Sequence, residues 1–271
     1  QIDRLTNVAS IGRNDTTSSS GFYAIKQDGT LWAWGCFANK ISRFAVCPDI
    51  ESPYLPTQIS EFSDVIDFKM GGGSYYILRR EGTIWAWGDN TFGQLGDGTT
   101  NDRDLPIQMI ELTGVKDITV ATTSGVFAYA LKEDGTVWAW GYNSTLGTKE
   151  PPSTLTLPTP TLVVGLSDIT KISIEGWFRL ALKKDGTVWA WAANIGNGST
   201  KGQPNAVQVI GLTDVIDIKS ISSGFSSASY ALKKDGTVWA WGSGSLKDGT
   251  PVEYLIPTQM CTLSGITNIV Q

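Results

Sequence analysis

The hydrophobic and polar positions of the chain follow one pattern that occurs five times. In the clearest copy, Asp235 to Gly242, apolar Val238 and Ala240 alternate with Trp239 and Trp241. Alternation of this kind is typical of a β-strand, whose successive side chains point to opposite faces. Because both faces of this strand are apolar, we expect neighbouring sheets to cover it on both sides. The other copies of the motif span residues 28–35, 81–88, 134–141 and 185–192.

Each repeat is predicted to form four strands. An apolar run such as Val115 to Ile118 predicts the first strand, and a run such as Tyr230 to Lys233 predicts the second. An Asp-Gly pair (Glu81-Gly82 in the second copy) predicts a tight hairpin, because Gly readily adopts the positive φ that two-residue loops need. The fourth strand carries a proline, which cannot donate to a ladder and is therefore expected at an outer edge. These prolines are Pro56, Pro106, Pro158, Pro204 and Pro257.

Four-stranded sheets repeated in tandem predict an all-β fold, a five-bladed β-propeller of about four strands per blade. We expect a single propeller domain over residues 1–271, with repeats at approximately 5–61, 62–111, 112–165, 166–211 and 212–262. Ten of the eleven Trp residues lie in the repeated motif, where packing between blades explains them. Residues 263–271 repeat the first-strand pattern a sixth time. We expect this segment to pair with another molecule, to begin a longer array, or to replace the first copy in blade one.

Composition and charge reduce the number of function classes that the sequence allows. The net charge of −5 argues against binding to nucleic acid, which relies on clustered Lys and Arg. The chain has no apolar run long enough to cross a membrane, so we expect no membrane insertion. Histidine is absent, which removes the commonest general base and the commonest metal ligand. We therefore expect no catalytic residues, no cofactor and no metal. A start at Gln1 would suit a mature secreted protein or an excised domain.

The run Tyr230 to Gly242 resembles the regulator-of-chromosome-condensation repeat, and so does Gly88 to Thr99. The resemblance covers essentially the whole chain and implies a propeller, most often of seven blades, although only five repeats occur here. The eukaryotic founder of the family exchanges guanine nucleotide on a small GTPase and docks on chromatin. This chain lacks the His usual in such repeats and has no basic tail. Its plain motif resembles bacterial, secreted or cell-surface members, including inhibitors of β-lactamases and repeats within adhesive surface proteins.

Aromatic residues follow a Gly after each predicted first strand. We expect these turns at one end of the propeller, where rigid aromatics suit binding to a protein or stacking on sugar rings. The alternative is that they cap the core at the ends of strands. If this aromatic rim binds, Trp177, Phe178, Tyr75 and Phe225 should be markedly exposed. The candidate rim residues are Phe22, Tyr23, Tyr75, Tyr76, Phe127, Trp177, Phe178 and Phe225.

The connection between the third and fourth strands varies most between repeats, and variable loops on a rigid scaffold often set specificity. In the first repeat this connection provides a second candidate binding surface. Its candidate residues are Phe37, Arg43, Phe44 and Tyr54. Cys36 and Cys47 lie in the same loop, and a disulfide between them is the favoured arrangement. A bridge from either one to Cys261, or free thiols, are the alternatives.

Two sets of polar residues suggest a metal site but have a simpler interpretation. The third position of each first strand is polar, and either a bound cation or solvated polar groups would explain it. The residues are Ser10, Asp67, Asp117, Lys171 and Asp217. The segment Asp89 to Asp102 is rich in Asp, Asn and Thr but lacks the spacing of a dedicated calcium loop. We therefore interpret it as a structural turn.

These observations favour a non-catalytic recognition or surface-assembly module that is extracellular or located at the cell surface. We expect it to bind a protein partner or neighbouring copies of itself, and no nucleic acid. A carbohydrate-binding lectin and a protein inhibitor of an enzyme such as a β-lactamase are the alternatives. Similar pockets in every blade would favour the lectin, whereas the unequal turn lengths count against it.

Overall fold

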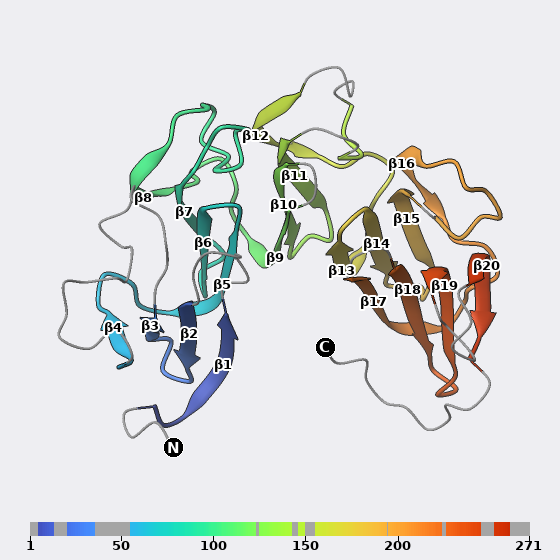
Figure 1. Cartoon of the computed structure of the whole chain (residues 1–271), viewed down its shortest axis with the longest axis horizontal. Helices are drawn as coiled ribbons and strands as arrows, with labels where there is room; N and C mark the ends of the chain where they lie inside the picture. Colours follow the sequence, from blue (N-terminus) through green and yellow to red (C-terminus); the bar gives the residue numbers. More distant parts are fainter. Residues whose placement is uncertain are drawn as a thin grey trace. The chain divides into compact units, whose positions relative to one another are not determined.

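The computed structural model of the chain describes residues 5–13, 21–35, 55–122, 125–142, 146–149, 155–193, 195–223, 226–244 and 252–260. These residues form twenty β-strands and no helix. The strands make five antiparallel sheets, each of four consecutive strands (Figure 1). We call these sheets blades 1 to 5 in chain order. The predicted all-β fold of five four-stranded blades is confirmed, and no described helix is available to cross a membrane.

The first three blades contain strands β1 to β12. Blade 1 consists of β1 (Val8–Arg13), β2 (Gly21–Lys26), β3 (Leu31–Gly35) and β4 (Thr57–Ile59). Blade 2 consists of β5 (Val65–Gly71), β6 (Ser74–Arg79), β7 (Ile84–Gly88) and β8 (Arg103–Gln108). Blade 3 consists of β9 (Val115–Thr122), β10 (Val126–Lys132), β11 (Val137–Tyr142) and β12 (Thr156–Leu162).

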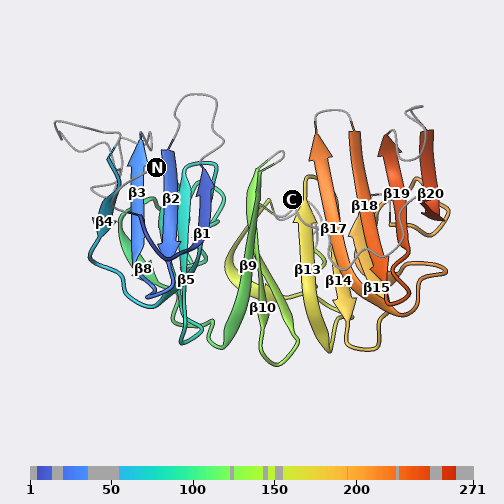
Figure 2. The same ribbon diagram turned by 90° about the horizontal axis from the view of Figure 1, so that it is seen from below.

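The last two blades contain strands β13 to β20. Blade 4 consists of β13 (Ile169–Glu175), β14 (Phe178–Lys183), β15 (Val188–Ala192) and β16 (Gln203–Gln208). Blade 5 consists of β17 (Val215–Ser223), β18 (Ser226–Lys233), β19 (Val238–Gly244) and β20 (Val252–Gln259), which run side by side in Figure 2. The fourth strand forms the edge of every sheet, as the prolines predicted. Four of these prolines lie within that strand, and Pro56 directly precedes β4.

The Asp-Gly hairpins form as the sequence predicts. In blade 1, Gly29 adopts a φ of +79°, and the backbone N–H and hydroxyl of Thr30 both donate to the Asp28 carboxylate, at 3.0 and 2.7 Å. The hydroxyl bond, followed by the backbone bond, lowers the pKa of Asp28. The Thr30 hydroxyl also accepts a hydrogen bond from Trp32 Nε1 at 3.1 Å. The hairpin therefore fixes the first Trp of the motif as well as the turn.

A backbone hydrogen bond joins each of the first four hairpins to the blade that follows. The carbonyl of the hairpin glycine accepts from the N–H of the residue that opens the next first strand. The pairs are Gly29 with Val65 (3.0 Å), Gly82 with Val115 (3.1 Å), Gly135 with Ile169 (3.0 Å) and Gly186 with Val215 (3.1 Å). We call this bond the hairpin clamp. It uses only backbone groups, so it needs no particular side chain at either residue.

Consecutive blades bury two different faces against each other. Between blades 1 and 2, Ile25 and Leu31 of blade 1 pack with Phe68 and Trp87 of blade 2. Between blades 4 and 5, Leu180, Leu182, Val188 and Ala190 pack with Ile218 and Trp241. In both cases the later blade contributes its Trp face and the earlier blade contributes its aliphatic face. The two apolar faces of the repeated strand are thus both used in packing.

The chain divides into two compact units. One comprises Gln1–Lys132, Trp140–Tyr142 and Thr156–Pro160, and the other comprises Glu133–Ala139, Asn143–Leu155 and Thr161–Gln271. The division passes through blade 3, so blades 1 and 2 belong to the first unit and blades 4 and 5 to the second. The expectation of a single domain with the repeat boundaries given above stays a prediction. Residues 263–271 lie outside the described residues.

Candidate functional site

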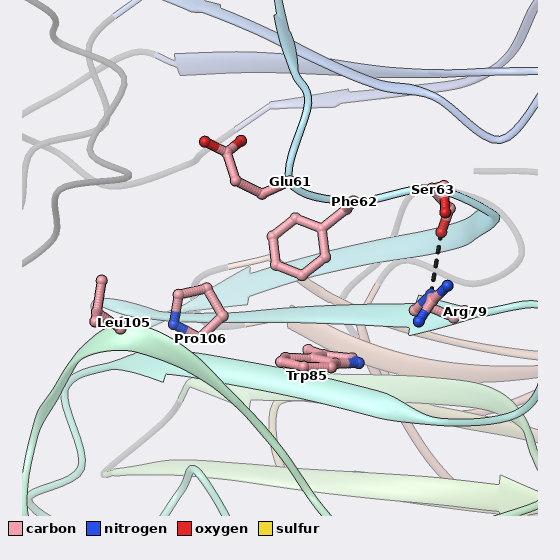
Figure 3. Close-up of a pocket in the computed structure, with 7 residues that line it drawn as sticks. All are labelled: Glu61, Phe62, Ser63, Arg79, Trp85, Leu105 and Pro106. Carbon is pink, nitrogen blue, oxygen red and sulfur yellow. Dashed lines mark hydrogen bonds between the residues drawn. The ribbon is translucent and has the colours of Figure 1, made fainter.

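A cavity of about 320 Å³ opens on the outer part of blade 2, where the connection from blade 1 passes β7 and β8 (Figure 3). Its floor and walls are mainly apolar, and its edge carries two charged side chains. The lining residues are Glu61, Phe62, Ser63, Arg79, Trp85, Leu105 and Pro106. We call this cavity the blade 2 pocket. All seven residues belong to the first unit.

The apolar lining comes from three segments that the blade brings together. Phe62, in the connection between β4 and β5, is buried and points toward Trp85 of β7 (Figure 3). The two rings meet edge to face with their centroids 6.0 Å apart, while Phe62 also stacks on Trp87 at 5.9 Å. Leu105 and Pro106 come from the edge strand β8, and Leu105 is 54% exposed. A large apolar side chain therefore lies open to solvent beside a preformed aromatic floor.

Arg79 closes one end of the blade 2 pocket. Its Nε donates to the carbonyl of Ser63 at 3.1 Å, and its Nη1 lies 3.2 Å from Oε1 of Glu81. In blades 1, 4 and 5 this position is Lys, and its ammonium lies 5.5 to 5.8 Å from the ring centre of the first Trp. Arg79 instead spans the connection and the hairpin. The guanidinium of Arg79 therefore forms one edge of the blade 2 pocket, whereas in blades 1, 4 and 5 a lysine ammonium lies over the ring of the first Trp.

The hydrogen bonding of Trp85 also sets blade 2 apart. In the other four blades the first Trp donates from Nε1 to the hydroxyl of the hairpin Thr, at 3.1 to 3.3 Å. Blade 2 has Glu81 in place of Asp, and the Thr83 hydroxyl donates to Glu81 Oε1 at 2.9 Å. The buried Nε1 of Trp85 has no hydrogen-bond partner among the described residues. The pocket thus has an aromatic floor whose polar atom lacks an acceptor within the described part of the chain.

The structure places the predicted aromatic rim differently from the expectation. Tyr75 and Phe178, two of the four residues expected to be exposed if the rim binds, are buried, and so are Tyr76 and Phe127. The reason is that β6, β10 and β14 begin at or before these residues, and both faces of those strands are covered. Tyr75 stacks on Trp87, with ring centres 5.4 Å apart.

The other rim residues differ in their surroundings. Trp177 in the β13–β14 turn is exposed, Phe22 is partly exposed and stacks on Trp34, and Tyr23 is half-buried with its ring edge-on to Phe68. A binding role for these three stays a prediction. Phe225 lies outside the described residues, as do the second candidate surface (Phe37, Arg43, Phe44 and Tyr54) and the three cysteines.

The polar third position of the first strands coincides with a β-bulge. The register shifts between Val65 and Asp67, and the equivalent shift occurs at the start of β1, β13 and β17. Asp67 accepts from the N–H of Phe68 at 2.8 Å and forms an ion pair with Lys69 at 2.9 Å. Burial lowers the pKa of Lys69, but the Asp67 and Asp117 carboxylates outweigh it and raise the pKa overall.

In the second unit, Lys171 forms an ion pair with Asp217. Among the described residues, no group of three or more Asp, Glu, Cys or His side chains is arranged to hold a metal ion. Asp67 and Asp217 are thus each paired with a lysine, and the solvated-polar and cation interpretations stay predictions.

The segment Asp89 to Asp102 is held together by its own hydrogen bonds. Asn90 is at the centre: its Nδ2 donates to Asp97, Thr99 and Asn101, and its Oδ1 accepts from Leu95 N–H at 2.9 Å. The guanidinium of Arg103 forms an ion pair with Asp97. Burial alone would raise the pKa of Asp97, but bonds from Thr99 and Arg103 together lower it. These contacts support the interpretation as a structural turn.

Sequence reasoning did not identify the blade 2 pocket. Its residues lie in the connection before β5, at the end of β6, on β7 and on the edge strand β8, and no motif joins them. Two departures from the repeat marked the place, namely Arg79 where the other four copies have Lys and Glu81 where they have Asp.

Comparisons with known proteins agree with the repeat pattern. Residues 81–128 match the family model "Regulator of chromosome condensation (RCC1) repeat". Residues 65–94 and 218–246 match a second model with the same description. Among curated proteins, the E3 ubiquitin-protein ligase HERC2 of Homo sapiens is 30% identical over 180 residues. That match covers 63% of this chain and 4% of the ligase.

A further relative and two solved structures extend over most of the chain. The mitochondrial RCC1 domain-containing protein RUG3 of Arabidopsis thaliana is 28% identical, over 93% of this chain and 61% of its own length. Human WBSCR16 superposes with a TM-score of 0.70 at 20% identity, covering 89% of this chain and 65% of that one. Prp20p of Saccharomyces cerevisiae gives 0.68 at 19%, covering 89% and 61%. The fold is that of RCC1 β-propellers, and the chain spans less than two thirds of each of these proteins.

Proposed function

Since the chain belongs to the regulator of chromosome condensation repeat family, we propose that it is a non-catalytic protein-binding module and that the blade 2 pocket is its binding site. Relatives of this fold support a binding role. Prp20p is known for its binding properties to Gsp1p and histones, and yeast RCC1 has been crystallised with Kap60 bound to it. The ligase activity of HERC2 does not bear on this chain, which matches only 4% of that protein.

The observation that carries the proposal is the preformed apolar hollow beside exposed Leu105. An aliphatic or aromatic side chain of a partner placed there would contact Phe62, Trp85 and Pro106 and would cover Leu105. Hot spots in protein interfaces are pockets of this kind, filled by one large side chain and ringed by polar contacts.

Charge at the pocket edge indicates what lies next to the anchor. Arg79 forms an ion pair with Glu81, whereas Glu61 is exposed and its carboxylate points away from Trp85 and Pro106 (Figure 3). We therefore propose a partner segment that presents a large apolar side chain next to Lys or Arg. The net charge of −5 favours the same partner, because opposite charge speeds the encounter.

The test uses a random peptide library displayed on phage and selected on the immobilised chain. Selected peptides are synthesised, and their affinity is measured by fluorescence anisotropy. We expect Leu105→Asp and Glu61→Lys each to weaken binding by roughly tenfold or more. The matched control is Ile256→Asp, because Ile256 precedes the edge-strand proline of blade 5 and is similarly exposed. It should leave binding unchanged.

Two results would overturn the proposal: peptides without a shared apolar and basic pair, or affinities that Leu105→Asp and Ile256→Asp reduce equally. Circular dichroism of both variants verifies that each is folded. A bacterial, extracellular or cell-surface setting remains part of the proposal, as the sequence suggested it. Carbohydrate binding and enzyme inhibition remain the alternatives, and a chain that binds neither a glycan array nor a β-lactamase would favour the protein-binding role.

A further inference from the structure

The last residue of the second strand is Lys in four blades and Arg in blade 2. In every blade this residue lies opposite the first residue of the first strand. In blades 1, 2, 4 and 5 its N–H donates to the carbonyl of the hairpin Thr at 2.9 or 3.0 Å. The backbone at this position is therefore equivalent between these blades, and the side chain is what differs. The five residues are Lys26, Arg79, Lys132, Lys183 and Lys233.

In blades 1, 4 and 5 this lysine lies over the ring of the first Trp. Its ammonium is 5.5 Å from the ring centre in blades 1 and 4 and 5.8 Å from it in blade 5. A cation within about 6 Å of an aromatic ring centre is attracted by the negative face of the ring. The first Trp of the repeat therefore accepts a cation that the chain itself supplies. The pairs are Lys26 with Trp32, Lys183 with Trp189 and Lys233 with Trp239.

Blade 2 has the same tryptophan without the lysine. The Nε of Arg79 donates to the Ser63 carbonyl (Figure 3), and its Nη1 pairs with Glu81. Within the described part of the chain, no cation lies over the ring of Trp85, which meets the Phe62 ring edge to face. Trp85 is only partly buried and lines the blade 2 pocket. The ring that blades 1, 4 and 5 cover with their own lysine is therefore accessible here to a ligand.

The charges around the blade 2 pocket also suit a cation. Glu61 and Glu81 carry two negative charges, while Arg79 carries one positive charge and is paired with Glu81. The apolar walls suit the stem of a lysine, because its methylene groups would contact Phe62 and Pro106 while its ammonium stays partly hydrated. A carboxylate or phosphate ligand, by contrast, would have to displace Glu81 from Arg79.

We propose that the basic residue of the partner segment is a lysine whose ammonium lies over Trp85, where blades 1, 4 and 5 place their own lysine. This inference rests on the proposed function and adds which basic residue binds and what it contacts. The apolar side chain of the segment then packs against Leu105 and Pro106. The chain itself favours lysine over arginine, because Arg79 at this position bonds to a carbonyl and a carboxylate instead of lying over the ring.

Two forms of a peptide selected on the chain test whether the pocket binds a cation. One form carries trimethyllysine in place of the lysine, and the other carries its neutral isostere, in which a tert-butyl group replaces the trimethylammonium. The two side chains have the same shape, so only the charge distinguishes them. We expect the neutral form to bind about two- to fivefold more weakly in fluorescence anisotropy, as the loss of an exposed cation–π contact predicts. Equal affinities, or a peptide that binds more tightly with arginine than with lysine, would overturn this inference.

Two variants of the chain locate the cation at Trp85. Arg79→Lys gives blade 2 its own lysine over that ring, so the peptide should bind about two- to fivefold more weakly. Arg79→Gln loses the same bonds to Ser63 and Glu81 without adding an ammonium. It should bind the peptide more tightly, because a like charge is removed from the pocket edge. Arg80→Lys, at the exposed neighbouring arginine, is the control and should leave binding unchanged.

The outcomes separate this inference from the proposed function. Binding that Leu105→Asp does not weaken would overturn both, because the blade 2 pocket would then not be the site. Binding that Leu105→Asp weakens but Arg79→Lys leaves unchanged would overturn only the lysine at Trp85. Equal weakening by Arg79→Lys and Arg79→Gln would do the same, since Arg79 would then act through its bonds alone. Circular dichroism verifies that each variant is folded, and Lys at position 79 matches the other four repeats.

Discussion

Strands β1 and β9 have the same sequence pattern but different surroundings. Each opens with a valine, turns through a bulge at the next positions, and places an isoleucine opposite an alanine. Val115 and Ile118 of β9 are buried, and β9 contacts β5 and β6 of blade 2. Val8 and Ile11 of β1 are exposed. The repeat thus specifies the strand, while the neighbouring blade decides what the strand contributes to stability.

The largest difference in the free energy of unfolding is expected between variants of Ile118 in β9 and Ile11 in β1. Ile118→Ala should lower the free energy of unfolding by about 2 to 5 kcal/mol, because it leaves a cavity between blades 2 and 3. Ile11→Ala should change it by less than about 0.5 kcal/mol in dilute solution, since its side chain is already solvated. Urea unfolding followed by tryptophan fluorescence measures both. Equal losses would contradict the difference in burial on which the comparison depends.

The hairpin clamp at the start of β9 is expected to give the next largest effect. A Cβ added at Gly82 would lie 2.9 Å from the Val115 nitrogen, and the φ there is +78°. Gly82→Ala should therefore cost about 2 to 3 kcal/mol. Gly211→Ala is the control. Gly211 has a similar φ of +76°, but no atom lies within 4 Å of the position of an added Cβ. This variant should therefore lose only the about 1 kcal/mol that a left-handed backbone conformation costs a residue with a side chain. Thermal unfolding of the two variants gives the difference, and a similar cost for both would mean that the clamp contributes little.

Tyr76 and Tyr23 occupy the same place in blades 2 and 1, each opposite an alanine. The Tyr76 hydroxyl is buried and donates to the Gln94 carbonyl at 2.7 Å, and Trp140 of blade 3 donates to the same oxygen at 2.7 Å. Tyr76→Phe should thus destabilise the chain by about 1 kcal/mol. Tyr23→Phe should stay within about 0.5 kcal/mol, since Tyr23 is half-buried. Chemical denaturation decides, and the opposite order would contradict the inferred link between the blade 2 turn and blade 3.

The smallest effect concerns pH and the same turn. Hydrogen bonds from Thr99 and Arg103 outweigh burial and lower the pKa of Asp97 below its usual value. The stabilisation is therefore complete above the unfolded value of about 3.9 and is lost as the pH falls through the lower folded value. Asp97→Asn should reduce stability at neutral pH and flatten its decline in acid. Unfolding curves between neutral pH and about pH 3 test this, and parallel declines in both proteins would exclude the contribution.

The fold was predictable because its signals are local and repeated. The Asp-Gly hairpin, the two tryptophans with apolar residues between them, and the proline on the edge strand each have one physical meaning, and five copies remove the ambiguity of any single one. The bulge at the polar third position was not predicted. Its signal in the sequence was a polar residue in an otherwise apolar strand. In blade 2 this residue is Asp67, whose carboxylate accepts a hydrogen bond from the N–H of Phe68.

The candidate sites were less predictable because burial depends on where a strand begins. Tyr75 and Tyr76 closely follow Gly73, and the sequence suggested a turn that exposes them. The strand β6 already begins at Ser74, so both side chains enter the blade. The blade 2 pocket was missed for the opposite reason. Phe62, Trp85 and Leu105 are far apart in the chain, and only the packed blade brings them together.

The hairpin clamp has a consequence for how such a chain changes over generations. Because the clamp joins only backbone groups of consecutive repeats, an inserted or deleted repeat meets the same acceptor before it and the same donor after it. Recombination that adds or removes one whole repeat would therefore yield chains whose new junctions can form the same backbone contact. Repeat proteins with nearest-neighbour stability tolerate such events well. A single genetic exchange could accordingly change the number of blades and still leave every hairpin clamp with both of its partners.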